Sequence, residues 1–223
     1  MTGVEAILFD AGGTLIHVDG ERLCRAAGVP YRASEFRDAE NAGISAVRKA
    51  LERKPDSTDA ERLPVFLDAI LTALGLDSGP SRREAAGRIR DEHGRSNLWS
   101  APCEGAAEVL DALHARGYRL GLISNADGRV RGLLESAGVA GRLELILDSA
   151  EVGMEKPDVR IFQEGARRLG VDPARCAYVG DIYEIDVTGA EAAGMRAVLI
   201  GDCPAPETVT RVKGLSHLLE LFP

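Results

Sequence analysis

The stretch Glu5-Ala-Ile-Leu-Phe-Asp10-Ala-Gly-Gly-Thr14 decides how this chain folds. Its apolar run ends in a glycine turn, which is typical of a strand buried on both faces. Asp10 therefore lies at the carboxyl end of a predicted strand, where ligands collect in open α/β sheets. Gly12 and Gly13 allow the backbone to approach a bound group closely. Taken alone, the segment could also be an ordinary strand-to-loop turn with a solvated Asp10.

In the second half of the chain, apolar runs that are typical of strands alternate with apolar stripes that are typical of helices. Strands are expected at residues 119–124, 143–148, 176–180 and 196–200. Between and around them, helical stripes are expected near residues 106–117, 128–137, 161–169, 184–193 and 216–221. Strands that alternate with helices of this length predict βαβ units and a parallel sheet. Right-handed crossovers then bring the carboxyl ends of these strands to the same edge.

Residues 17–99 differ from the rest of the sequence. They carry little strand signal, and their charged, helical segments cover residues 32–53, 58–74 and 82–93, with glycine and proline breaks between them. We therefore predict an α/β fold in which residues 1–16 and 100–223 form the core and residues 17–99 form an inserted, all-helical domain. Because this insertion leaves and rejoins the core beside Asp10, we expect it to act as a cap.

Composition excludes several classes of partner. The 223 residues carry a net charge of −8 and only 4% aromatic residues, which argues against nucleic acids and acidic membranes as partners. No apolar stretch approaches the roughly 20 residues that span a bilayer. The four cysteines are far apart, which disfavours zinc. With the first strand so near the N-terminus, we expect no signal peptide and a cytoplasmic protein. The sequence does not indicate an oligomeric state.

Polar residues follow the predicted strands at a few positions. They are Asp10, Ser124-Asn125, Lys156, and Asp181 with Asp186. A carboxylate nucleophile, a hydroxyl, a lysine and an acidic pair at one edge form a set suited to phosphoryl groups and Mg²⁺, which prefers carboxylate oxygens. Each has a simpler explanation on its own: Lys156 as a surface lysine, Ser124-Asn125 as a helix cap, and Asp186 as a solvated side chain.

The order of these motifs resembles that of the haloacid dehalogenase superfamily over essentially the whole chain. Residues 9–15 are similar to the family's first motif, Asp-x-Asp-Gly-Thr, and residues 123–125 to its second. Lys156-Pro-Asp158 is similar to the third, and residues 178–190 to the fourth. The resemblance implies a Rossmann-like core, a subfamily I helical cap, Mg²⁺, and hydrolysis of a small phosphorylated substrate.

The resemblance also implies a role for each motif residue. Asp10 would attack phosphorus to give an aspartyl-phosphate, which water then hydrolyses. Lys156 would hold the phosphoryl group, with Ser124 and Asn125 binding substrate. The implied metal ligands are Asp10, Asp181, Asp186 and the backbone carbonyl of Gly12.

Gly12 departs from the family pattern. The family's phosphatases carry a second Asp at this position, which protonates the leaving group and then activates water. A general acid typically contributes 10²–10⁴-fold to the rate. Three outcomes follow: the enzyme acts on substrates with good leaving groups, its phosphatase activity is vestigial, or another residue serves as the acid. The candidates for a replacement acid are His17, Lys49, Lys54 and His93.

Two other functions compete with a phosphatase. The first is a 2-haloacid dehalogenase, which also lacks the second Asp but uses no Mg²⁺ and replaces the Gly-Asp of the fourth motif. Here Gly180-Asp181 is intact, which favours metal-dependent chemistry. The second is a binding or regulatory module that kept the metal pocket without turnover. The sequence contains no Gly-x-Gly-x-x-Gly after the first strand, no Gly-x-Ser-x-Gly and no P-loop, which excludes dinucleotide, serine-hydrolase and P-loop chemistry.

Overall fold

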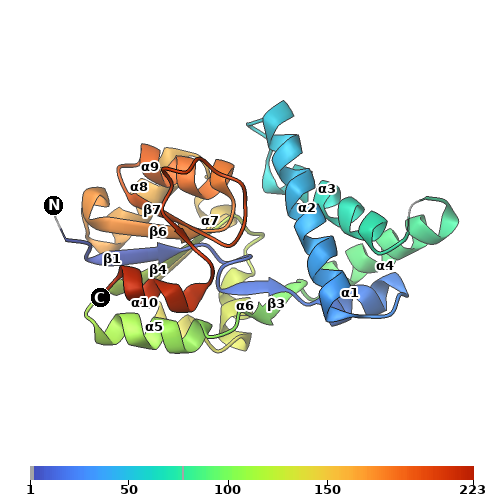
Figure 1. The fold of residues 1–223 in the computed structure, drawn as a ribbon, viewed down its shortest axis with the longest axis horizontal. Coiled ribbons are helices and arrows are strands. Elements are labelled where there is room, and N and C mark those ends of the chain that lie inside the picture. Colours follow the sequence, from blue (N-terminus) through green and yellow to red (C-terminus); the bar gives the residue numbers. More distant parts are fainter. Residues whose placement is uncertain (1–2, 77) are drawn as a thin grey trace. The chain divides into compact units, whose positions relative to one another are not determined.

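The computed structural model describes residues 3–76 and 78–223, which form two compact units. The first, or core, unit contains the chain up to His17 together with Ser100–Pro223, and the second, or helical, unit is Val18–Trp99. The chain passes between them through β2 (Ile16–Val18) and β3 (Trp99–Pro102), which pair as a two-stranded sheet. Figure 1 shows the elements of both units in chain order.

The core unit contains a six-stranded sheet of order β5-β4-β1-β6-β7-β8. Its neighbouring strands pair in parallel, which confirms the predicted α/β fold. The strands are β1 (Ala6–Phe9), β4 (Arg119–Ser124), β5 (Leu145–Asp148), β6 (Cys176–Gly180), β7 (Arg196–Ile200) and β8 (Arg211–Val212). The two-residue β8 at the edge was not predicted, because its sequence is too short to show a period.

The sheet order makes β1 a topological switch point. From β1 the chain goes to β4 and β5 on one side, and later to β6, β7 and β8 on the other. Phe9 pairs with Leu122 of β4 and with Val179 of β6, so the three strands end within two residues of one another. The Asp10 amide donates to the Val179 carbonyl at 2.8 Å. Ligands bind at such switch points in open α/β sheets, and the first residue after β1 is Asp10.

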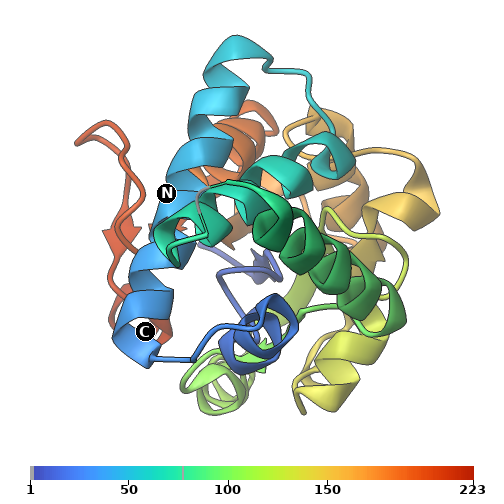
Figure 2. The ribbon, with the colours of Figure 1, turned by 90° about the vertical axis from the view of Figure 1, so that its right-hand side faces the viewer.

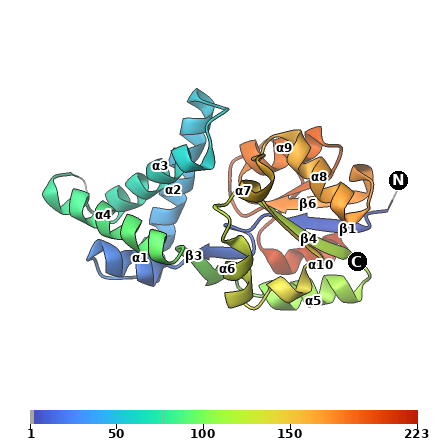
Figure 3. The same cartoon turned by 180° about the vertical axis from the view of Figure 1, so that it is seen from behind.

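Helices cover both faces of this sheet. Figures 1 and 3 show α8 and α9 over one face and α5 and α10 over the other. The helices of this unit are α5 (Ala106–Ala115), α6 (Val130–Ser136), α7 (Ser149–Val152), α8 (Val159–Leu169), α9 (Thr188–Ala192) and α10 (Leu218–Leu221). Single 3₁₀ turns occupy Ala140–Arg142, Pro173–Arg175 and Leu215–His217. The helix expected at 184–193 is divided, because Tyr183–Val187 forms a π-helical turn before α9.

The helical unit is built on the pair α2 and α3. Its helices are α1 (Gly20–Ala27), α2 (Ala33–Arg53), α3 (Asp59–Ala73) and α4 (Pro80–Arg95), and Figure 2 shows them from a second direction. Thr58 and Glu61 form a capping box that begins α3. The helix α1 was not predicted, although Asp19 caps its first turn. Among the described residues, no helix is both long and apolar enough to cross a membrane.

Gly43 allows α2 and α3 to pack closely. A Cβ at this position would lie 2.7 Å from the ring of Phe66, which is buried and packs against Trp99 with 5.4 Å between ring centroids and 36° between ring planes. Gly87 of α4 provides a contrast, since no heavy atom lies within 4 Å of where its Cβ would be. Both glycines are helical, so alanine improves helix propensity at both, and only the contact differs.

We expect opposite effects from the two alanine substitutions on the free energy of unfolding. Gly43→Ala should lower it by about 1–3 kcal/mol, because the added methyl group displaces a packed ring. Gly87→Ala should raise it by up to about 1 kcal/mol through helix propensity alone. Urea unfolding of the full chain, followed by circular dichroism, measures both. Equal stabilisation by the two substitutions would contradict the close α2–α3 contact.

Candidate active site

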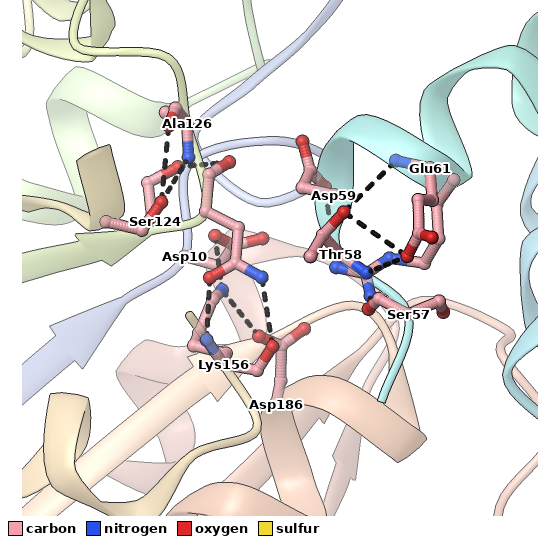
Figure 4. A network of polar contacts seen from close by, with 12 residues as sticks. Asp10, Ser57, Thr58, Asp59, Glu61, Ser124, Ala126, Lys156 and Asp186 are labelled. Carbon is pink, nitrogen blue, oxygen red and sulfur yellow. Dashed lines mark hydrogen bonds and ion pairs between the residues drawn. The ribbon is translucent and has the colours of Figure 1, made fainter. Parts of the chain in front are cut away.

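Lys156 lies at the centre of the polar cluster beyond β1. Its ammonium donates to Asp10 Oδ1 at 2.6 Å, to Asp186 Oδ1 at 2.7 Å and to the Tyr178 hydroxyl at 2.9 Å. An ammonium has three N–H groups, so the three acceptors use all of them. The side chain is only 2% exposed. Figure 4 shows Lys156 between Asp10 and Asp186, and the structure thus excludes the alternative of a surface lysine.

Asp186 is held on both carboxylate oxygens. Oδ1 accepts from Lys156, and Oδ2 accepts from the Ile182 amide at 3.0 Å. The π-helical turn Tyr183–Val187 carries this residue back toward β6, where its carboxylate lies against the α-carbon of Gly180. A side chain at Gly180 would clash with the Asp186 carboxylate. Asp186 is 1% exposed, which excludes the solvated position that its sequence context allowed.

Asp181 reaches the cluster from the end of β6. A side chain at Gly13 would clash with its carboxylate, so the glycine turn after β1 provides the space that Asp181 occupies. Gly13 has a φ of 71°, in the left-handed region that favours glycine. Carboxylate oxygens of Asp10, Asp181 and Asp186 lie within 4.8 Å of one another. The predicted edge of the sheet thus brings these three side chains and Lys156 together.

The electrostatics of the cluster follow from its burial and its excess of carboxylates. Burial raises the pKa of Asp10 to about 6, although the Lys156 ammonium opposes the shift. Burial and the neighbouring carboxylates of Asp186 and Asp10 raise the pKa of Asp181 well above its usual value. Burial alone would lower the pKa of Lys156, but Asp10 and Asp186 outweigh it and hold that pKa well above the usual value. Lys156 therefore stays charged at neutral pH.

This donor set fits a hard divalent cation. With all three carboxylates ionised, they and the one ammonium would carry two negative charges in excess, and besides burial this repulsion between carboxylates is among the causes of the raised pKa values of Asp10 and Asp181. A divalent cation would balance that excess charge. Mg²⁺ prefers one or two carboxylates together with other oxygen ligands, and Asp10 and Asp181 supply such oxygens within reach of each other. Because Gly13 has no side chain, the backbone leaves room for the Asp181 carboxylate beside Asp10. The metal-ligand roles of Asp10, Asp181, Asp186 and the Gly12 carbonyl stay predictions.

Ser124 and Asn125 lie at the end of β4, on the other side of β1. The Ser124 side chain is buried, and its hydroxyl is 3.5 Å from the carbonyl of Asn125. The Asn125 amide is bonded at both ends to the backbone of Lys156: Oδ1 accepts from the Lys156 amide at 2.7 Å, and Nδ2 donates to its carbonyl at 3.0 Å. Asn125 therefore fixes the backbone of Lys156, and the substrate-binding roles of both residues stay predictions.

Tyr178 is the residue of this cluster to which the sequence pattern assigned no role. It lies within the fourth motif, two residues before Gly180, where a continuous apolar run predicts only a core position. Its side chain is 1% exposed, and its hydroxyl meets Lys156 and, 3.4 Å away, Asp186. The sequence pattern offers no signal for this contact, because Tyr178 and Lys156 are 22 residues apart.

Known proteins with similar sequences are hydrolases. The chain matches the family described as haloacid dehalogenase-like hydrolase over residues 4–194. Haloacid dehalogenase-like hydrolase domain-containing protein 3 of Homo sapiens is 34% identical over 167 residues, which cover 69% of this chain and 65% of that protein. A glyceraldehyde 3-phosphate phosphatase of Methanopyrus kandleri is 29% identical over 214 residues, which cover 88% of this chain and 84% of that protein. The match to the human relative thus spans slightly less than two thirds of its length.

Solved structures share the fold. A dehalogenase with an intermediate complex has a TM-score of 0.71 at 24% identity, covering 100% of this chain and 98% of that chain. The haloacid dehalogenase-type phosphatase from Thermococcus onnurineus has a TM-score of 0.61 at 22% identity, covering 98% and 97%. At these identities the likeness shows the fold alone. Together with the sequence match over most of the chain, it establishes that the chain belongs to the haloacid dehalogenase-like hydrolases.

Proposed function

We propose that this hydrolase is a Mg²⁺-dependent phosphatase that acts on a small phosphorylated metabolite through an aspartyl-phosphate at Asp10. The pairing of Asp10 with the buried Lys156, beside the carboxylates of Asp181 and Asp186, carries the proposal. It combines a nucleophile, a fixed cation and oxygen ligands at the switch point of the sheet. Relatives named as phosphatases of glyceraldehyde 3-phosphate and of phosphoserine support a small phosphorylated substrate in general, and not the leaving group, because both of those substrates are alkyl phosphates.

In the proposed reaction, a carboxylate oxygen of Asp10 attacks phosphorus, and the bond from phosphorus to the leaving-group oxygen breaks. The oxygen of a water molecule then attacks phosphorus of the aspartyl-phosphate, which restores the carboxylate and releases inorganic phosphate. Lys156 holds a positive charge next to Asp10 throughout, and the Ser124 hydroxyl donates to a phosphoryl oxygen. Asp10, Asp181 and the Gly12 carbonyl would hold Mg²⁺, with Asp186 in support. The ion would neutralise negative charge at the phosphoryl group.

Leaving-group protonation is the step for which the proposed roles leave no group. Asp181, whose pKa is raised by burial well above its usual value, would be ionised as a Mg²⁺ ligand and would have no proton to donate. Gly12 has no side chain to donate a proton. Lys156 is a poor replacement, because its three N–H groups are bonded to protein acceptors and its pKa lies well above the usual value. We therefore infer that the substrate has a leaving group that departs without a proton, such as a carboxylate or an aryl oxide.

Two alternatives differ from the proposal in what they predict for metal and turnover. A 2-haloacid dehalogenase-like hydrolase shares the absence of a second Asp, but it has no need of the Asp181 carboxylate, which here lies in the acidic cluster. A binding or regulatory module would bind Mg²⁺ or phosphate without turnover. The first experiment below distinguishes all three.

Hydrolysis of nitrophenyl phosphate tests the proposed function. We expect turnover that requires Mg²⁺ and that Asp10→Asn abolishes, because an amide cannot form the aspartyl-phosphate. Asp202→Asn is the matched control, since Asp202 is an exposed aspartate of the same unit, and its turnover should equal that of the wild type. Phosphate binding without turnover would favour the module, and metal-independent release of halide from a 2-haloacid would favour the dehalogenase.

Calorimetry tests the metal ligands separately from catalysis. Asp181→Asn removes one negative charge and one strong ligand, so its affinity for Mg²⁺ should fall by tenfold or more relative to the wild type. Asp202→Asn again serves as the control and should leave the affinity unchanged. If Asp181→Asn bound Mg²⁺ as tightly as the wild type, Asp181 would not be a ligand.

Substrate preference tests the consequence of Gly12. Acyl and nitrophenyl phosphates should be hydrolysed faster than alkyl phosphates by about 10²–10⁴-fold, the contribution of a general acid. Gly12→Asp should raise the turnover of alkyl phosphates. A side chain would be strained at Gly13, on which the left-handed φ of this turn falls, but not for that reason at Gly12. Equal rates on both classes of substrate would show that another group already donates the proton.

A further inference from the structure

Tyr178 supplies the one uncharged acceptor of the Lys156 ammonium. The other two are carboxylates, Asp10 at 2.6 Å and Asp186 at 2.7 Å, and the hydroxyl completes the set at 2.9 Å. Without it, the third N–H of a buried ammonium would have no partner in this arrangement, which carries a large cost. The ammonium would then turn toward other acceptors, and its distance to Asp10 would change.

The Tyr178 hydroxyl can accept from Lys156 because its own proton is directed elsewhere. It donates to the Ile123 carbonyl of β4 at 3.0 Å, whereas Asp186 Oδ1 lies farther away at 3.4 Å. A hydroxyl has one proton and two lone pairs, so donation to Ile123 leaves a lone pair for the ammonium. Tyr178 lies on β6, and in the sheet β1 lies between β6 and β4. The tyrosine therefore joins the two strands that flank the one leading to Asp10.

The ring of Tyr178 has little freedom to move. Phe162 of α8 packs edge-on against it, with 4.9 Å between ring centroids and 74° between ring planes. Phe162 is itself confined, because a side chain at Gly189 of α9 would clash with it. Both rings are almost completely buried. Packing thus fixes the position of the Tyr178 hydroxyl, and the hydroxyl fixes the direction of one N–H of the Lys156 ammonium.

We propose that Tyr178 is a positioning residue of this hydrolase, whose hydroxyl holds the Lys156 ammonium in register with the Asp10 nucleophile. Catalytic groups need to be held within about 0.5 Å of their productive places. The proposal rests on the proposed function for its effect on turnover, but the contact between Tyr178 and Lys156 can be tested without it.

The kinetic test compares Tyr178→Phe with the wild type on nitrophenyl phosphate and Mg²⁺. Phenylalanine keeps the ring packing and removes only the hydroxyl. We expect kcat to fall by about tenfold to a hundredfold, the worth of one hydrogen bond to a charged group, with KM changed by less than about twofold. Tyr118→Phe is the matched control, because its hydroxyl bonds to the Pro223 carbonyl at the chain end, and its kcat should not change. An unchanged kcat, or a rise in KM alone, would overturn the proposal.

Crystal structures of the wild type and of Tyr178→Phe give the readout that does not depend on turnover. We expect Lys156 Nζ to move by more than about 0.5 Å relative to Asp10 when the hydroxyl is removed. An ammonium that keeps its place would overturn the positioning role even if the enzyme lost activity. Absence of turnover in the wild type would count against the proposed phosphatase, and the displacement of Lys156 would still decide the role of Tyr178.

Discussion

The burial of one ammonium against two carboxylates, those of Asp10 and Asp186, is the constraint on which the arrangement of this site depends. Removing a lysine and two aspartates from water costs several kcal/mol per ion, and only short, well-directed contacts offset this cost. Lys156 meets that condition, with Asp10 and Asp186 both within 2.7 Å of its nitrogen. Removing one partner from such a buried pair typically costs about 3–5 kcal/mol, because it leaves the other charge uncompensated. The charges therefore hold one another in place, and each depends on the backbone that delivers it.

The sheet delivers these charges because parallel strands end at one edge. The pairing of Phe9 with Leu122 and with Val179 brings the ends of three strands within two residues of one another, so the residues that follow them converge. Two glycines then leave space for the carboxylates. The Asp181 carboxylate occupies the space that a side chain at Gly13 would fill, and the Asp186 carboxylate occupies the corresponding space at Gly180. Backbone register and the absence of two side chains thus place the carboxylates close enough together to share a cation.

Those features that depend on periodicity and on strand ends could be predicted from the sequence. The strands at 119–124, 176–180 and 196–200 have the predicted bounds, because each is an apolar run closed by a polar or glycine turn. The two-residue β8 and the short strands β2 and β3 were missed because they are too brief to show a period. Position 178 lies in a continuous apolar run, which cannot reveal that a buried hydroxyl faces a lysine from a segment 22 residues away. The two hydrogen bonds from the Asn125 side chain to the Lys156 backbone could not be predicted for the same reason. Like the contact of Tyr178 with Lys156, they join segments that are distant in sequence.

The site thus separates into two parts that depend on the sequence in different ways. The pairing of Asp10 with Lys156 is supported by side chains from β6, from the turn after it and from the end of β4, so a change in any of them affects the others. Proton delivery to a leaving group depends, in the family pattern, on the single side chain two residues after the nucleophile, and here that residue is Gly12. Gly12 contributes no side chain to the ion-pair network, so its identity can change the class of leaving group without changing the charge balance around Lys156. Under the proposed function, the buried network would set where a phosphoryl group reacts, and the residue at position 12 would set which bonds to phosphorus break.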